Sequence, residues 1–170
     1  MKTKNYVLHP TYYILPLLFL VLGGVGCIEF SSSATEGTGG IWKTVDRGEK
    51  WLQNSAWVTS AGTKNIGGEN IRVFVTDPQD HLAVYAGTQE SGLFYSYDAG
   101  ESWFQAKSLT SGRIRDIGVD PKDKCTIYVT AGQRIWKSTD CNRSYTSSYH
   151  ETRPEVIMNQ IEIDWFDPSI

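Results

Sequence analysis

One eight-residue pattern, Ser/Thr-x-Asp-x-Gly-x-x-Trp, occurs twice in this 170-residue chain and a third time in altered form. We name the copies box 1 (residues 44–51), box 2 (residues 96–103) and box 3 (residues 138–145). In box 3, Asn142 replaces the Gly and a Tyr replaces the Trp. Similarity at a regular interval predicts an architecture of stacked repeats. The positions that define the pattern are Thr44, Asp46, Gly48, Trp51, Ser96, Asp98, Gly100, Trp103, Ser138, Asp140 and Tyr145.

A second marker repeats in phase with the boxes. An Ile stands six residues before an Asp-Pro pair in residues 71–78, 114–121 and 161–168. Successive Asp-Pro pairs are 43 and 47 residues apart, and successive boxes are 52 and 42 residues apart. The longer first interval indicates an insertion, which we place in residues 60–70, because this Gly-rich polar stretch predicts a loop.

The segments within each repeat are short, rich in β-branched and aromatic residues, and separated by turn-forming residues. This composition is typical of strands, and no stretch shows the helical period of apolar residues. A repeat of about 40 to 50 residues with about four strands is the pattern of a propeller blade. We therefore predict an all-β fold, a partial β-propeller of about two to three blades over residues 39–170, with blade repeats near 39–59, 71–107, 114–149 and 161–170.

The residues of each box suit a tight turn between two strands. Asp98 can accept hydrogen bonds from backbone N–H groups of its own turn, Gly100 permits a positive φ, and Trp103 can cover the hairpin. The pattern resembles the Asp-box, or bacterial neuraminidase repeat. That resemblance implies a β-propeller of Asp-box repeats, in which the box is a structural staple far from any active site. Calcium binding by the three Asp residues is the alternative.

The N-terminal residues predict export. A basic start precedes an apolar stretch at residues 14–26 that is too short to span a bilayer, so residues 1–26 are predicted to be a signal peptide. The residues before Cys27 resemble a bacterial lipobox, which implies that Cys27 is lipidated and anchors the chain to a membrane. Secretory cleavage near Gly26 is the alternative. Residues 27–38 predict a flexible tether.

The position of the last residue, Ile170, falls inside a repeat. Two complete repeat intervals do not close a ring, because propellers typically have four to eight blades. We expect that the sequence is a C-terminally truncated fragment. Residues 41–51 would then form the outer part of a blade, and the missing part would supply its inner strands. Self-assembly of several short chains into one ring is the alternative.

Two cysteines remain once Cys27 is assigned to the anchor. An exported protein occupies an oxidising compartment, so Cys125 and Cys141 are predicted to form a disulfide. The bridge would close a loop of about 16 residues in the repeat whose box has lost its Gly and Trp, and would contribute about 3 kcal/mol in the chain-entropy model. Two free thiols are the alternative.

Charge and absent motifs exclude several functions. Without residues 1–26 the chain has 14 Lys and Arg against 19 Asp and Glu, a net charge of −5, and no basic stripe, so nucleic acid is not expected as a partner. His9, His81 and His150 are scattered, and no two-cysteine zinc motif, nucleophile elbow or phosphate loop occurs. We therefore predict no metal and no cofactor.

Two hydrolase families share the box. Sialidases also need an arginine triad, a Tyr–Glu pair and an Arg-Ile-Pro signature, of which only Arg153-Pro154 gives a faint trace. Xyloglucanase-type glycoside hydrolases carry such repeats, and two carboxylates can cleave a glycosidic bond. Asp116 and Asp164 interrupt apolar segments and are the best catalytic candidates, although strand-end Asp residues that face solvent would explain them equally.

Three aromatic residues outside the boxes, Trp57, Tyr149 and Trp165, are candidates for stacking on sugar rings or on a peptide. Packing between blades is the alternative for all three. The repeats also look like those of the sortilin-type propeller and of photosystem II assembly factors, and these resemblances imply a binding scaffold.

We therefore predict an exported, lipid-anchored, non-catalytic propeller scaffold that binds a protein, peptide or glycan. The absent catalytic constellation and the predicted anchor support this interpretation. The alternative is the N-terminal fragment of a secreted glycoside hydrolase, xyloglucanase-like or sialidase-like, with catalytic residues partly in missing blades.

Overall fold

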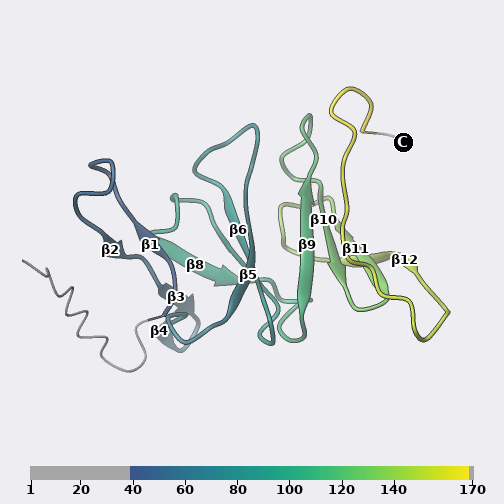
Figure 1. Cartoon of the computed structure of the whole chain (residues 1–170), viewed down its shortest axis with the longest axis horizontal. Coiled ribbons are helices and arrows are strands. Elements are labelled where there is room, and N and C mark those ends of the chain that lie inside the picture. Colours follow the sequence, from purple (N-terminus) through teal and green to yellow (C-terminus); the bar gives the residue numbers. More distant parts are fainter. Residues whose placement is uncertain (1–38, 169–170) are drawn as a thin grey trace, which may run out of the picture. The chain divides into compact units, whose positions relative to one another are not determined.

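The computed structural model describes residues 39–168, which contain twelve strands and no helix (Figure 1). The prediction of an all-β fold is confirmed. The predicted signal peptide, the lipidation site Cys27 and the tether 27–38 lie outside the described residues. Across residues 39–168 there is no helix long and apolar enough to cross a membrane. The strands are β1 Trp42–Lys43, β2 Leu52–Gln53, β3 Ala56–Thr59, β4 Gly62–Asn65, β5 Ile71–Thr76, β6 Val84–Thr88, β7 Leu93–Ser96, β8 Ser102–Gln105, β9 Ile114–Val119, β10 Ile127–Ala131, β11 Arg134–Ser138 and β12 Thr146–His150.

Two consecutive four-stranded units have the architecture of propeller blades. Strands β5 to β8 pair in sequence order and antiparallel, and strands β9 to β12 do the same. The Asp-Pro pairs follow β5 and β9, because Pro donates no ladder hydrogen bond and ends a strand. Box 2 and box 3 connect the third strand of each unit to its fourth strand. Box 1 joins β1 to β2, which pair as a separate hairpin.

The insertion in the first interval is not simply a loop, and the prediction for residues 60–70 was wrong where β4 lies. Strands β3 and β4 form a hairpin, and β3 pairs in parallel with β8, so the sheet grows to six strands. The turn at Gly62 has φ +119°, and the Thr59 hydroxyl donates to the Gly62 carbonyl oxygen at 2.7 Å. Strand β4 could not be recognised from the sequence, because all four of its residues are exposed and it therefore lacks the apolar residues that indicate a strand.

The apolar core lies on both faces of the first four-stranded unit. One cluster joins it to the second unit and includes Tyr85, Leu93, Ile117 and Val129. The other cluster lies toward the first hairpins and centres on Trp103 with Phe94 and Ile66, among others. Strand β6 is buried along its whole length, as expected for a strand that is covered on both faces.

The third copy of the Ile-to-Asp-Pro template, residues 161–168, contains no regular strand. Ile161 and Ile163 instead pack over Gly118 of β9. A Cβ atom at Gly118 would come within 3.1 Å of Ile163 Cγ1, so the close approach depends on the missing side chain. The segment therefore lies against β9, the first strand of the second unit, without extending its sheet.

Candidate functional site

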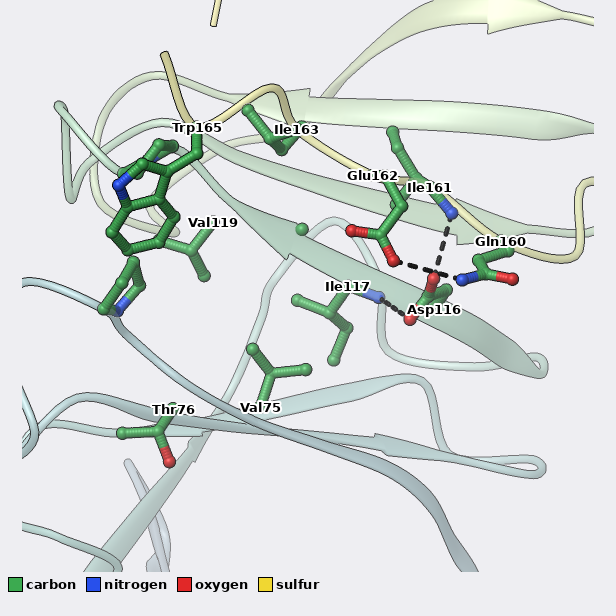
Figure 2. A pocket seen from close by; sticks show the side chains of 13 residues that line it. Val75, Thr76, Asp116, Ile117, Val119, Gln160, Ile161, Glu162, Ile163 and Trp165 are labelled. Atoms are coloured by element: carbon green, nitrogen blue, oxygen red, sulfur yellow. Dashed lines mark hydrogen bonds between the residues drawn. The ribbon is translucent and has the colours of Figure 1, made fainter.

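A groove of about 380 Å³ lies between strand β9 and the segment of residues 160–165 (Figure 2). Its wall on the β9 side is mainly aliphatic, with Ile117 and Val119, and Val75 from the end of β5 lines the groove as well. Its polar side chains are Thr76, Asp116, Gln160 and Glu162, and the ring of Trp165 lies at one end. An apolar cleft with a few polar groups is the usual form of a ligand site.

The Asp116 carboxylate, one of the two catalytic candidates, holds backbone in place. The Ile161 N–H donates to Asp116 Oδ2 at 2.9 Å, and the Ile117 N–H donates to Asp116 Oδ1 at 3.0 Å. Each oxygen thus accepts a main-chain hydrogen bond, and one of these fixes a segment 45 residues away in the chain. This geometry explains why an Asp stands in an apolar strand: its carboxylate holds residues 160–165 against β9 as a tether.

The Asp164 carboxylate, the other catalytic candidate, caps its own turn. Phe166 N–H and Asp167 N–H donate to Asp164 Oδ1 at 2.7 and 2.6 Å. The backbone N–H groups of Asp167 and Phe166, with a smaller effect from Lys122, lower the pKa of Asp164. A carboxylate held ionised in this way is poorly suited to act as a general acid. Asp164 is also not among the residues that line the groove.

Two groove residues were missed from the sequence alone. Gln160 and Glu162 are exposed, and the Gln160 amide donates to Glu162 Oε1 at 3.1 Å (Figure 2). Both flank Ile161, whose position on β9 depends on Asp116. The repeat template directed attention to the Ile and the Asp-Pro pair, so nothing in the sequence distinguished these two polar side chains.

The three predicted aromatic candidates have different surroundings. Trp165 is 60% exposed and lines the groove. Trp57 is half-buried, with its ring edge-on to Phe94 at 5.2 Å. Tyr149 is 47% exposed on β12, and its hydroxyl donates to Glu151 Oε2 at 3.1 Å. Only Trp165 of the three contributes to the groove between β9 and residues 160–165.

The carboxylates of the three boxes are also bound within their own turns. In box 2, Ser96 Oγ donates to Asp98 Oδ1 at 2.6 Å, the Ser102 N–H donates to the same oxygen at 2.9 Å, and the Gly100 N–H donates to Ser96 Oγ at 2.9 Å. The equivalent bonds recur in box 1 and box 3. Two consecutive residues of each box have positive φ: Arg47 and Gly48, Ala99 and Gly100, and Cys141 and Asn142.

Box 3 replaces the Gly and Trp of the pattern with a hydrogen-bonded network. The Tyr145 hydroxyl donates to Asn142 Oδ1, and Asn142 Nδ2 donates to the Tyr97 hydroxyl at 2.9 Å. Asn tolerates the left-handed conformation better than most residues, which suits its φ of +67°. The structure also places Cys141 of this turn in a disulfide with Cys125.

The described residues contain no group of three or more His, Cys, Asp or Glu side chains that could hold a metal ion. In each box the Asp carboxylate already accepts a backbone hydrogen bond through Oδ1, whereas Ca²⁺ takes six to eight oxygen ligands.

Comparison with known proteins gives one curated relative and several solved structures. No family model matches the chain. A xyloglucanase of Hypocrea jecorina (strain QM6a) is 29% identical over 106 residues, which are 62% of this chain and 12% of that protein. An ancestral GH74 enzyme superposes with a TM-score of 0.56 at 14% identity, over 74% of this chain and 17% of that one. A GH74 xyloglucanase from Xanthomonas campestris aligns with a TM-score of 0.42 at 15% identity, over 69% and 28% of the respective chains.

The superposition on the ancestral GH74 enzyme, with its TM-score of 0.56, decides the architecture. The chain is a segment of a β-propeller. Its two four-stranded units are consecutive blades, and the predicted partial propeller is confirmed. The chain spans only a small part of the length of each protein that it matches.

Proposed function

We propose that the chain is part of a glycoside-hydrolase-type propeller and binds a β-glucan such as xyloglucan. The observation that carries this proposal is the 106-residue match to a xyloglucanase. It favours the hydrolase fragment, the alternative drawn from the sequence, over the non-catalytic scaffold. The propeller fold supports it, and the groove lies on β9, the first strand and one edge of the second described blade.

The described residues are proposed to bind the glucan rather than to cleave it. Glycoside hydrolysis needs two carboxyl groups that are free to exchange protons or attack the sugar. Asp116 and Asp164 instead accept backbone hydrogen bonds. We assign the ring of Trp165 to stacking on a sugar face, and Gln160 and Glu162 to hydrogen bonds with sugar hydroxyls. The acid and base would then come from other parts of a longer protein.

Xyloglucan binding by the full chain tests the proposal. Affinity electrophoresis in gels with and without xyloglucan should show retardation of the wild-type chain. Trp165→Ala should weaken binding about tenfold, because an aromatic stacking contact of about 1.4 kcal/mol is lost. Phe166→Ala is the matched control, because Phe166 is 85% exposed and does not line the groove.

The same samples should be assayed for release of reducing ends. No turnover is expected from the full chain. Failure of the wild-type chain to bind xyloglucan would overturn the proposed function. Turnover that Asp116→Asn abolishes would instead give Asp116 a catalytic role and contradict its assignment as a tether.

We also propose that the three boxes are Asp-boxes in the family sense. The shared bonds from the first hydroxyl to the Asp carboxylate, and from the backbone to both, support this assignment. The resemblance to sortilin-type propellers and to photosystem II assembly factors rests on the repeat alone.

For the location of the protein, we propose export and attachment to the extracytoplasmic face of a membrane through lipidated Cys27. In that compartment the partner would be a protein, a peptide or a glycan, and the groove at β9 favours the glycan. The support is the apolar stretch at residues 14–26 and the small residues that precede the cysteine. Mass spectrometry of the isolated chain tests it, and an unmodified mature N-terminus at Cys27 would remove the anchor.

A further inference from the structure

A second groove, of about 580 Å³, lies away from the one at β9 and is built partly by the insertion in the first repeat interval. Residues 57–60, from β3 and the turn after it, form one part of its lining. Strands β7 and β8 contribute Tyr95 and Phe104, and Arg143 of box 3 contributes from the next blade. The hairpin of β3 and β4 thus creates a surface that a four-stranded blade alone would lack.

The groove contains a stacked aromatic pair. Tyr95 and Phe104 face each other across β7 and β8, with ring centroids 5.8 Å apart and an interplanar angle of 27°. Phe104 is 36% exposed and Tyr95 is half-buried, so the pair is only partly covered by protein. The half-buried ring of Trp57 lines the groove as well. Flat aromatic surface beside polar groups suits the C–H face of a pyranose ring.

The charge of the groove is positive in an acidic chain. Lys107 and Arg143 line it, and none of the lining residues within 39–168 is Asp or Glu. Both cations are exposed and form no hydrogen bond or ion pair with the described residues. The chain as a whole carries a net charge of −3. Two unpaired cations beside aromatic rings favour the binding of an anionic ligand.

The cation at position 143 is not required by the turn that holds it. The same position of box 1 is Glu49, and that of box 2 is Glu101, although all three boxes share the same hydrogen bonds. Box 3 alone presents a positive charge there, and it is the box whose position lines the groove. The positive charge at position 143 is therefore explained by its place in the groove and not by the structure of the turn.

We propose that this groove binds a carboxylated polysaccharide, a chain of uronic-acid units. One sugar ring packs on the Tyr95–Phe104 pair, the guanidinium of Arg143 forms a bidentate ion pair with a sugar carboxylate, and Lys107 holds a neighbouring carboxylate. This site is separate from the proposed xyloglucan groove and takes a ligand of different charge. An acidic peptide shares the charge of this ligand but lacks its flat ring faces, so the aromatic pair favours the glycan.

Binding of polygalacturonate to the full chain tests this inference. Calorimetry should show binding of polygalacturonate that weakens as salt is raised, and much weaker binding of the fully methyl-esterified polymer. Arg143→Gln should lower the affinity about tenfold, because a charge-assisted hydrogen-bond pair is lost, and Arg143→Glu should lower it further. Glu stands at this position in the other two boxes, so the Arg143→Glu variant is expected to fold.

Two control variants distinguish binding at this groove from general charge attraction and from binding at the β9 groove. Lys50→Gln removes one exposed positive charge in box 1 and should leave the affinity for polygalacturonate unchanged. Trp165→Ala should leave it unchanged too, although it weakens xyloglucan binding. Equal binding of the charged and esterified polymers, equal effects of the Lys50 and Arg143 variants, or binding of poly-glutamate as tight as that of polygalacturonate would overturn the proposal.

Discussion

The two complete blades have the same backbone frame but close their boxes in different ways. In the first blade, the backbone N–H of Ala99 donates to the carbonyl oxygen of Leu82 at 2.8 Å. In the second blade, the equivalent positions are Cys141 and Cys125, with the same backbone bond at 3.2 Å and a disulfide in addition. One pair of positions is therefore joined by a hydrogen bond alone, and the other by a covalent bond as well.

The side chains that cover the turn also differ between box 2 and box 3. Trp103 of box 2 is fully buried, its indole N–H donates to the Asn54 carbonyl oxygen at 2.8 Å, and a Cβ atom at Gly100 would lie 3.2 Å from its ring. Box 3 has the smaller Tyr145 ring and Asn142 in place of the Gly. The comparison teaches that one turn geometry can be held by a buried indole or by a hydrogen-bonded network with a disulfide.

The largest expected effect is that of Trp103→Ala. Removing this buried ring should lower the free energy of unfolding of the full chain by about 4 kcal/mol, because a cavity forms and the Asn54 carbonyl loses its partner. Trp51 has the same place in box 1 but is 56% exposed, so Trp51→Ala should cost about 1 kcal/mol or less. Urea unfolding followed by far-ultraviolet circular dichroism measures both. Equal losses would show that the motif position, not burial, sets the contribution.

The disulfide is expected to have the next largest effect. Replacing both Cys125 and Cys141 with Ser should lower the free energy of unfolding by about 3 kcal/mol, because the unfolded chain loses a constraint. The reduced wild-type protein should match this variant in urea unfolding. The paired change Leu82→Cys and Ala99→Cys should form a second bridge in the first blade, visible as a mass loss of two hydrogens. Failure of that bridge to form would show that the two blades are not equivalent at these positions.

The smallest expected effect concerns acid. The Ser144 side chain and backbone, followed by the Ser138 hydroxyl, lower the pKa of Asp140 to about 2 from its usual 3.8. Because the folded-state pKa is depressed, the stabilising contribution is present above about pH 4 and is lost as the pH falls toward about 2. Asp140→Asn should therefore lower the urea midpoint at neutral pH but not near pH 2. A difference that stays constant with pH would contradict this.

Much of the fold could be predicted from the sequence because the repeats carry local signals. The Asp of each box, the positive-φ position and the Asp-Pro pair mark turns through interactions within a few residues. Strand β4 was missed because Gly62–Asn65 are polar and exposed, and pair only with β3. Residues 161–168 have the strand template but form no strand, since the hydrogen bonds that define one come from a partner.

The candidate sites were harder to predict, because distant segments create them. Asp116 stood out as a polar residue in an apolar strand, yet its role depends on Ile161, which is 45 positions later. Arg143 has the sequence context of an ordinary turn residue of box 3, and only the fold brings it to the groove that Tyr95 and Phe104 line. The sequence pattern predicts the strands and turns that these residues occupy, but it does not predict which distant residues they contact.

The parallel contact between β3 and β8 has a consequence for how the protein behaves in concentrated solution. It moves the outer edge of the six-stranded sheet from β8 to β4. That edge strand is only four residues long, is exposed at every residue, and carries the charged side chain of Lys64. Short, charged edges resist strand-to-strand association between copies. The inserted hairpin thus guards the sheet against aggregation.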